Sequence, residues 1–294
     1  MIKFQSLARN VEIGANSYLL TVGETRILLD AGMHPKQDGK NALPEMDGID
    51  YDTIDAAILS HAHLDHSGAL PVLQRSQPDM PVFMSAPTKV LTEALLHNSV
   101  NVMNYKREQT GNTDYPLFTH REIGKASKKW LSPKHKESFN LDRSGKIDCS
   151  FYESGHVLGA VAPVIRSEGR NILYSGDVHF EDQTIIKGAT LPQAGIDVLI
   201  LESTRGGVAR PAEYSRQSEA LQLASSIEEC LSGRGSVMMP LFAMGKTQEM
   251  ITLLHEQQSK GTLRNIPFHV GGLSVKMTGI YDRFTSKVRR NHKG

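Results

Sequence analysis

Cysteine is almost absent from this chain. Only Cys149 and Cys230 occur among 294 residues, which excludes a disulfide scaffold and a zinc site built from cysteine alone. Such sparse cysteine fits a reducing compartment. Long apolar runs are also missing, since no stretch approaches the roughly 20 residues of a membrane-spanning helix, and residues 1–10 hold no apolar segment typical of a secretory signal. We therefore expect a soluble, cytoplasmic protein without a membrane partner.

Bulk composition favours no particular ligand. Hydrophobic residues make up 39% and charged residues 22%, as in a globular protein, and the net charge of +1 gives no overall preference for nucleic acid. The charge is nevertheless uneven, with 12 Lys or Arg against 7 Asp or Glu from residue 206 onward. A basic part of this kind suits a polyanionic partner, although it is often only a solvated surface. Its final stretch contains Lys276, Arg283, Lys287, Arg289, Arg290 and Lys293.

Short aliphatic runs alternate with helical patterns along the chain. Strands are predicted at residues 18–22, 26–30, 56–60, 82–84, 150–152, 172–175, 198–201, 236–240 and 268–270. Apolar residues at helical spacing predict helices at residues 69–73, 87–103, 215–231 and 247–258. The polar segment 104–150 is expected to hold loops and one short helix. Strands mixed with helices in this way indicate a layered α/β or α+β fold.

The densest group of reactive side chains follows one of these strands. His61, His63, Asp65 and His66 come between the strand at 56–60 and an apolar helix. His61 and His63 are two residues apart, so they share one face of an extended chain, and the other two can approach from beyond the turn. Imidazole and carboxylate groups are the ligands that suit Zn²⁺. Surface histidines beside a turn are the alternative, but such groups rarely gather without a partner.

Two further turns carry candidate ligands. His156 lies between Gly155 and Gly159 after the strand at 150–152, and Asp177 follows Gly176 after the strand at 172–175. Each of these turns, taken alone, is more often only a turn, because glycine and aspartate are ordinary turn residues. Their order along the chain makes the combination more specific.

This ordered set of residues resembles the metallo-β-lactamase superfamily. The positions that carry the resemblance are Asp30, His61-x-His63-x-Asp65-His66, His156 and Asp177. The resemblance implies an α/β fold of the αββα sandwich type and two zinc ions. It implies that the first zinc would be held by His61, His63 and His156. The second would be held by Asp65 and His66, with Asp177 bridging both, while Asp30 would orient a ligand histidine.

Later segments are similar to the β-CASP branch of that superfamily, which includes ribonuclease J and the pre-mRNA 3′-end-processing endonucleases. Leu201–Gly206 resembles the acidic motif of this branch, with Glu202 as its acidic residue, and Pro240–Glu249 agrees with the branch as well. The resemblance implies a metallo-β-lactamase-like domain at residues 1–205 and a β-CASP-like α/β domain, apparently incomplete, at residues 206–294.

The late histidine motifs of the family have no counterpart in this sequence. His255, His269 and His292 follow Glu202 in contexts that indicate structural residues, and His179 is a weak candidate for a substitute ligand. Gly245-Lys246-Thr247 resembles the end of a phosphate-binding P-loop, but Pro240 stands where that motif needs glycine, so we expect no ATP site. A helix N-terminus there can still favour a phosphate group.

The function implied by the resemblance is hydrolysis of RNA phosphodiester bonds, preferably in single strands, by a hydroxide that bridges two Zn²⁺ ions. Its catalytic residues would be Asp65, Asp177, Glu202 and Asp30. Endonuclease and 5′-exonuclease action both remain open. Two alternatives remain as well: a non-catalytic RNA-binding or scaffold member of the family, and a small-molecule metallo-hydrolase of the same fold. Exposed apolar surface on an incomplete sandwich would also allow a homo-oligomer.

Overall fold

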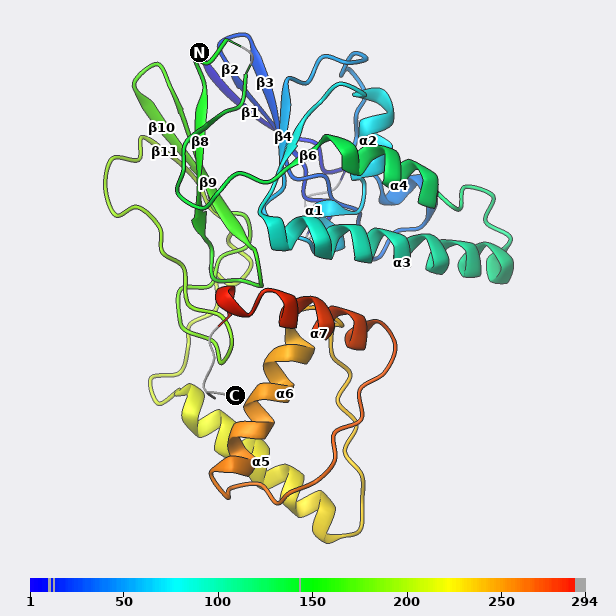
Figure 1. Ribbon diagram of the computed structural model, residues 1–294, viewed down its shortest axis with the longest axis vertical. Coiled ribbons are helices and arrows are strands. Elements are labelled where there is room, and N and C mark those ends of the chain that lie inside the picture. Colours follow the sequence, from blue (N-terminus) through cyan, green and yellow to red (C-terminus); the bar gives the residue numbers. More distant parts are fainter. Residues whose placement is uncertain (10–11, 13, 143, 289–294) are drawn as a thin grey trace. The chain divides into compact units, whose positions relative to one another are not determined.

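The computed structural model describes residues 1–9, 12, 14–142 and 144–288 (Figure 1). The chain forms two compact units. The first comprises Met1–Glu181 and Gly188–Glu202, and the second comprises Asp182–Lys187 and Ser203–Gly294. Four residues named in the sequence analysis lie outside the described residues: Arg289, Arg290, His292 and Lys293.

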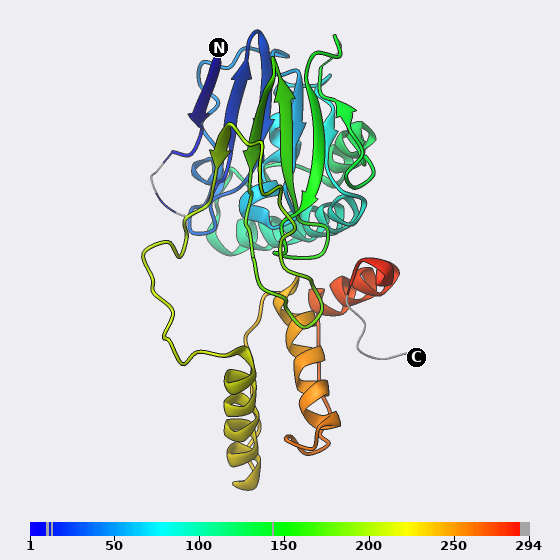
Figure 2. The ribbon, with the colours of Figure 1, turned by 90° about the vertical axis from the view of Figure 1, so that its left-hand side faces the viewer.

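The first unit is built on two β-sheets (Figures 1 and 2). One sheet has six strands, in the order β1 (Ile2–Ser6), β2 (Tyr18–Val22), β3 (Thr25–Leu29), β4 (Ala56–Ile58), β5 (Val82–Phe83) and β6 (Trp130–Leu131). The other has five, in the order β11 (Val198–Ile200), β10 (Arg170–Tyr174), β9 (Val161–Ser167), β8 (Asp148–Glu153) and β7 (Phe139–Asn140). Strands β3 to β6 run parallel, so their carboxyl ends meet at one edge of the first sheet.

An apolar core lies between the two sheets. Ile27, Leu29 and Ile58 of the first sheet are 0% exposed and pack in one cluster with Phe151 and Ile165 of the second sheet. Burial on both faces explains why the strands around β3 are nearly continuous apolar runs in the sequence, without the alternation of a half-buried strand. The loops that follow the inner strands are therefore attached to a buried core.

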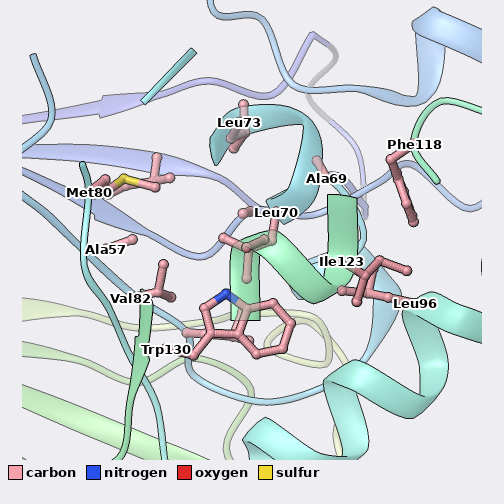
Figure 3. Close-up of a cluster of buried hydrophobic side chains, with 14 of the residues drawn as sticks. Ala57, Ala69, Leu70, Leu73, Met80, Val82, Leu96, Phe118, Ile123 and Trp130 are labelled. Atoms are coloured by element: carbon pink, nitrogen blue, oxygen red, sulfur yellow. The ribbon is translucent and has the colours of Figure 1, made fainter. Parts of the chain in front are cut away.

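Helices cover the other face of the six-stranded sheet. The main ones are α2 (Leu70–Ser76), α3 (Ala86–Thr110) and α4 (His120–Ala126). Figure 3 shows part of this second core, where Leu70, Leu96 and Ile123 from the helices meet Val82 and Trp130 from the sheet. The indole N–H of buried Trp130 donates to Gln74 Oε1 at 2.9 Å, so its polar atom is satisfied.

Sequence signals define the ends of these helices. Ser85 precedes α3, and its hydroxyl accepts the Thr88 N–H, while Gly111 ends the helix at φ 70°. Thr119 and Glu122 form a reciprocal capping box at the start of α4. The remaining helical segments are short: α1 (Leu64–Ser67) and the 3₁₀ turns Gly39–Ala42, Ser127–Lys129 and Thr285–Lys287. Among the described residues, no helix combines the length and the apolar character that crossing a membrane requires.

The second unit contains α5 (Arg216–Ser232), α6 (Lys246–Ser259) and α7 (Leu273–Arg283). Buried Ala224 and Ile227 of α5 pack with Leu254 of α6 and with Leu263. Glu249 of α6 is 7% exposed. Its carboxylate accepts the backbone N–H groups of Thr184 at 2.6 Å and Ile185 at 3.1 Å, and it pairs with Arg216. Residues 182–187 are thus held by a buried carboxylate within this unit.

Most predicted elements are confirmed, including the α/β class. The predicted strands at residues 236–240 and 268–270 are wrong, because the described residues of the second unit form no sheet. A strand needs a neighbour to satisfy its backbone groups. Here Met239 and Phe268 pack against the helical core instead, and Met238 is 91% exposed. The polar segment 104–150 contains α4 as expected, but also β6 and β7.

Candidate metal centre

The candidate ligands stand in loops at the ends of strands. Asp30 directly follows β3, and its N–H bonds to the carbonyl oxygen of Ile58 in β4. His61 and His63 lie between β4 and α1, and Asp65 and His66 lie within α1. His156 lies in the loop from β8 to β9, and Asp177 follows β10. The Val161 N–H bonds to the Ser60 carbonyl oxygen at 2.9 Å, which joins the two sheets at this edge.

Four ligand atoms from these loops converge. One atom each from His61, His63, His156 and Asp177 lies within 4.8 Å of all the others. His63 Nδ1 is 3.0 Å from His61 Nε2 and 3.1 Å from His156 Nε2, and Asp177 Oδ2 is 3.4 Å from His156 Nε2 and 3.9 Å from His61 Nε2. Tetrahedral zinc with ligands at ~2.0–2.1 Å would separate its ligand atoms by roughly 3.3 Å. The observed distances straddle that value, so this group fits a zinc ion.

Asp177 faces a second group with its other oxygen. Asp177 Oδ1 lies 3.2 Å from His66 Nε2, and Asp65 Oδ2 lies 3.8 Å from the same nitrogen. One carboxylate therefore directs Oδ2 towards His61 and His156 and Oδ1 towards His66. The same carboxylate thus contacts both groups of histidines. All six residues proposed as ligands from the sequence are brought together in the fold.

Asp30 lies behind the ligands and is 1% exposed. Its Oδ1 accepts the Ser60 N–H at 2.6 Å, and its Oδ2 accepts the Ser60 hydroxyl at 2.8 Å and the Tyr174 hydroxyl at 2.6 Å. Oδ2 also lies 2.8 Å from His66 Nδ1. A carboxylate only accepts, so His66 Nδ1 carries a proton, and Nε2, which faces Asp177, is the nitrogen that remains for a metal. Asp30 thus holds His66 in the tautomer that can bind a metal.

The electrostatics of the cluster favour ligand-ready protonation states. Burial, and then the charges of three neighbouring histidines, hold the pKa of His61 well below its ordinary value of 6.5. Burial acts to raise the pKa of Asp177, but the hydrogen bond with His66 and the charges of nearby histidines outweigh it and lower that pKa from 3.8 to about 2. A neutral imidazole and an ionised carboxylate are the forms that bind zinc.

His66 behaves differently in the metal-free protein. Burial acts to lower its pKa, but the charges of Asp30 and Asp177 and the hydrogen bonds to them raise that pKa well above 6.5. A cation at this position is thus stabilised by its surroundings, and a metal ion would take the place of the proton on Nε2.

Two glycines let the loops approach so closely. A Cβ on Gly176, which has φ 53°, would lie 2.6 Å from the Ser60 Cβ, and a Cβ on Gly155, which has φ 72°, would lie 2.2 Å from the His179 carbonyl oxygen. Real Cβ atoms do not come so near. The glycines beside Asp177 and His156 in the sequence are therefore needed to bring these ligands to the site.

Glu202 lies beside Asp177 and outside the converging ligand atoms. Its Oε1 accepts the Val178 N–H at 3.0 Å, and its own N–H bonds to Ser175 Oγ at 3.0 Å. Its side chain therefore holds the backbone after Asp177, and its backbone bonds to the side chain of a residue before Asp177. His179 is not in the converging group found among the described residues, and His255 lies on α6 as expected.

The turn before α6 is largely satisfied by its own chain. The Gly245 N–H donates to Gln248 Oε1 at 2.8 Å, and the Thr247 N–H and hydroxyl both bond to the Phe242 carbonyl oxygen. These internal bonds occupy donors that a phosphate group would use, so the helix N-terminus is a poor phosphate site.

Sequence reasoning missed three residues that shape the site. Ser60 and Tyr174 bind Asp30, and Asn16 Nδ2 lies 3.0 Å from His66 Nε2. None belongs to a ligand type that a motif search singles out. Ser60 was detectable as a polar residue directly before a candidate ligand, whereas Asn16 and Tyr174 reach the site only through the pairing of strands far apart in the chain.

Comparison with known proteins gives a consistent set of matches. The model of the family described as "Metallo-beta-lactamase superfamily domain" matches residues 19–204. Endoribonuclease ysh1 of Emericella nidulans is 33% identical over 297 residues, which cover 99% of this chain and 33% of that protein. Endoribonuclease ysh1 of Schizosaccharomyces pombe is 30% identical, with 99% of this chain and 37% of that protein covered.

A third relative carries a different name. Cleavage and polyadenylation specificity factor subunit 3 of Dictyostelium discoideum is 30% identical over 294 residues, which cover 98% of this chain and 36% of that protein. The chain thus spans about a third of the length of the curated relatives it matches.

Proposed function

Because this chain belongs to the metallo-beta-lactamase superfamily, we propose that it carries the metal centre of a zinc-dependent hydrolase that cuts RNA phosphodiester bonds. The resemblance predicted from the sequence, to this superfamily and to its RNA-processing nucleases, is confirmed by the family match and the relatives. The observation that carries the proposal is the convergence of His61, His63, His156 and Asp177. RNA is proposed as the substrate because two relatives are named endoribonucleases.

Zinc is proposed from the donor set, since three imidazoles and a carboxylate are a common zinc environment. A second zinc is proposed at His66, Asp65 and Asp177, because Asp177 directs a separate oxygen to each group. Zinc held there would supply a hydroxide near neutral pH and withdraw negative charge from the phosphoryl group.

The remaining residues hold this arrangement in place. Asp30 keeps the His66 proton on Nδ1, so that Nε2 stays free for a metal. Glu202 binds the Val178 N–H and thereby fixes the loop that presents Asp177. Both residues bond to protein groups next to the candidate ligands, so we assign both a positioning role. The RNA backbone would be attracted by basic residues of the second unit, such as Lys276 and Arg283, and binding should weaken as salt rises.

Two other functions are less well supported. A non-catalytic scaffold would have no need of six converging ligands, yet all six are present. A small-molecule hydrolase would use the same metals, but the similarity extends over 99% of the chain to proteins named for cutting RNA.

Cleavage of labelled single-stranded RNA by the purified chain tests the proposal. The wild type should cut RNA, chelation of metal should abolish the cut, and the double variant His61→Ala/Asp177→Ala should lose both metal and activity. His255→Ala is the matched control, because it removes a histidine on α6 outside the cluster, and it should keep both. Thioester and lactone substrates, tested in parallel, distinguish RNA cleavage from the activity of a small-molecule hydrolase. Undiminished cleavage by the metal-free double variant would refute the proposal.

A further inference from the structure

The side chain of Asn16 lies directly at the second ligand group. Its Nδ2 is 3.0 Å from His66 Nε2, the nitrogen that also faces Asp177 Oδ1 at 3.2 Å. Asn16 comes from the loop before β2, far in sequence from the histidine motif. It is a neutral amide among groups that are otherwise imidazoles and carboxylates.

A hydrogen bond from Tyr18 fixes the orientation of this amide. The Tyr18 hydroxyl donates to Asn16 Oδ1 at 3.0 Å, which places the oxygen towards Tyr18. The nitrogen Nδ2 is then the amide atom that lies beside His66 Nε2, the nitrogen left for a metal by the bond from Nδ1 to Asp30. The N–H bonds of Asn16 therefore point towards the metal centre.

The backbone of Asn16 is held as firmly as its side chain. Its N–H bonds to the Asp65 carbonyl oxygen at 2.8 Å, and its own carbonyl oxygen accepts the Gly32 N–H at 2.9 Å. A Cβ on Gly32 would lie 1.7 Å from the Asp65 oxygen and 2.7 Å from the Asn16 nitrogen. Three segments of the chain thus pack closely here. Asn16 cannot move away from Asp65 without breaking the hydrogen bond between their backbones.

A metal on His66 Nε2 would occupy the lone pair of that nitrogen, so the nitrogen could not accept from Asn16. Tyr18 would still bond to the amide oxygen, so the NH₂ group would keep facing the site. Its N–H groups would then be available to donate to a bound substrate. The neighbouring acidic side chains are acceptors as well, and they repel a phosphate. A fixed, neutral N–H donor is therefore the group at this position that suits an anionic oxygen.

We propose that Asn16 is a catalytic residue that donates a hydrogen bond to a non-bridging phosphate oxygen of the bound substrate. The inference rests on the proposed phosphodiester hydrolysis and adds to it a residue outside the six ligands. Asn16 takes part in no proton transfer. It would stabilise negative charge as that charge grows on the phosphoryl oxygens.

Binding of inorganic phosphate to the zinc-loaded chain, measured by calorimetry, provides a test that does not depend on turnover. Asn16→Ala should keep the zinc content of the wild type but bind phosphate about 10-fold or more weakly, because a hydrogen bond to a charged group is lost. Its kcat for RNA should fall about 100-fold. Asn101→Ala on the exposed side of α3 is the matched control and should match the wild type in all three measurements.

Asn16→Asp separates this role from support of His66. It places a carboxylate beside His66 Nε2, so zinc should be held at least as tightly while phosphate binding falls further than in Asn16→Ala. A purely supporting residue would instead lose zinc and phosphate together in both variants, which would overturn the proposal. Phosphate affinity in Asn16→Ala equal to that of the wild type would also overturn it and leave the proposed function intact. A wild type that neither holds zinc nor cuts RNA would overturn both.

Discussion

Replacing Asp30 by asparagine changes one oxygen of the site and leaves its shape. Oδ2 of Asp30 receives three hydrogen bonds, from Ser60 Oγ, His66 Nδ1 and the Tyr174 hydroxyl. Asp30 also has a φ of 59°, in the left-handed region that asparagine tolerates as well as aspartate does. Any effect of Asp30→Asn therefore comes from the lost charge and acceptor, without added backbone strain.

The size of the effect follows from these contacts. Hydrogen bonds to a charged group contribute about 1 kcal/mol more than neutral ones, so weakening three of them should cost about 3 kcal/mol of unfolding free energy. An amide NH₂ facing His66 Nδ1 also favours the other tautomer, with the proton on Nε2, where a metal would bind. Affinity for the second metal should therefore fall about 10- to 100-fold.

Urea unfolding followed by the fluorescence of Trp130 measures the first quantity, because Trp130 is the single tryptophan and lies in the core of the first unit. Zinc competition with a chromophoric chelator measures the second. Asp52→Asn is a matched control, since Asp52 also has a left-handed backbone, with φ 54°, but is exposed. It should change stability by less than about 0.5 kcal/mol. An Asp30→Asn variant that behaves like this control in both assays would refute the reasoning.

Three further predictions concern other parts of the fold. Gly32→Ala should lose zinc and unfold at lower urea concentration, because its Cβ would lie 1.7 Å from a backbone oxygen. Gly124→Ala in α4 is the control, because a Cβ there would have no atom within 4 Å, and it should be neutral or stabilising by up to about 1 kcal/mol. Equal urea midpoints for the two would contradict this. Glu249→Ala leaves two buried N–H groups without their acceptor, so it should lower the unfolding free energy of the second unit by about 2–5 kcal/mol. Amide hydrogen exchange at residues 184 and 185 should become faster. Unchanged exchange would count against this prediction. In metal-free protein the raised pKa of His66 should stabilise the fold fully below pH 6.5, and this stabilisation should be lost as the pH rises through the folded-state pKa. Urea midpoints of the wild type, measured over a pH series, should therefore fall in that range. The midpoints of Asp30→Asn should depend less on pH.

The sequence predicted which residues come together because their signal is local. His61, His63, Asp65 and His66 lie within one loop and one short helix, and glycines beside His156 and Asp177 mark turns that the fold needs. Strands such as β2 and β3 were predictable for a similar reason, since burial on both faces leaves long apolar runs.

The elements that were missed depend on partners far along the chain. Strand β9 contains Pro163, which argues against an inner strand. Its pairing with β10 extends only to Val164, so the missing N–H of Pro163 costs no bond on that side. Residues 236–240 show the opposite error, because β propensity says nothing about whether a neighbouring strand exists.

The proposed pair of zinc ions, held by residues from distant loops, is tested most directly by counting zinc. Inductively coupled plasma mass spectrometry should find about two zinc ions per wild-type chain, after dialysis against a weak chelator. His156 is the most informative residue to remove, because it lies 93 positions from His63 and only 3.1 Å from it in the fold. His156→Ala should retain fewer zinc ions than the wild type. A wild type without zinc, or a His156→Ala variant with the same zinc content as the wild type, would contradict the account.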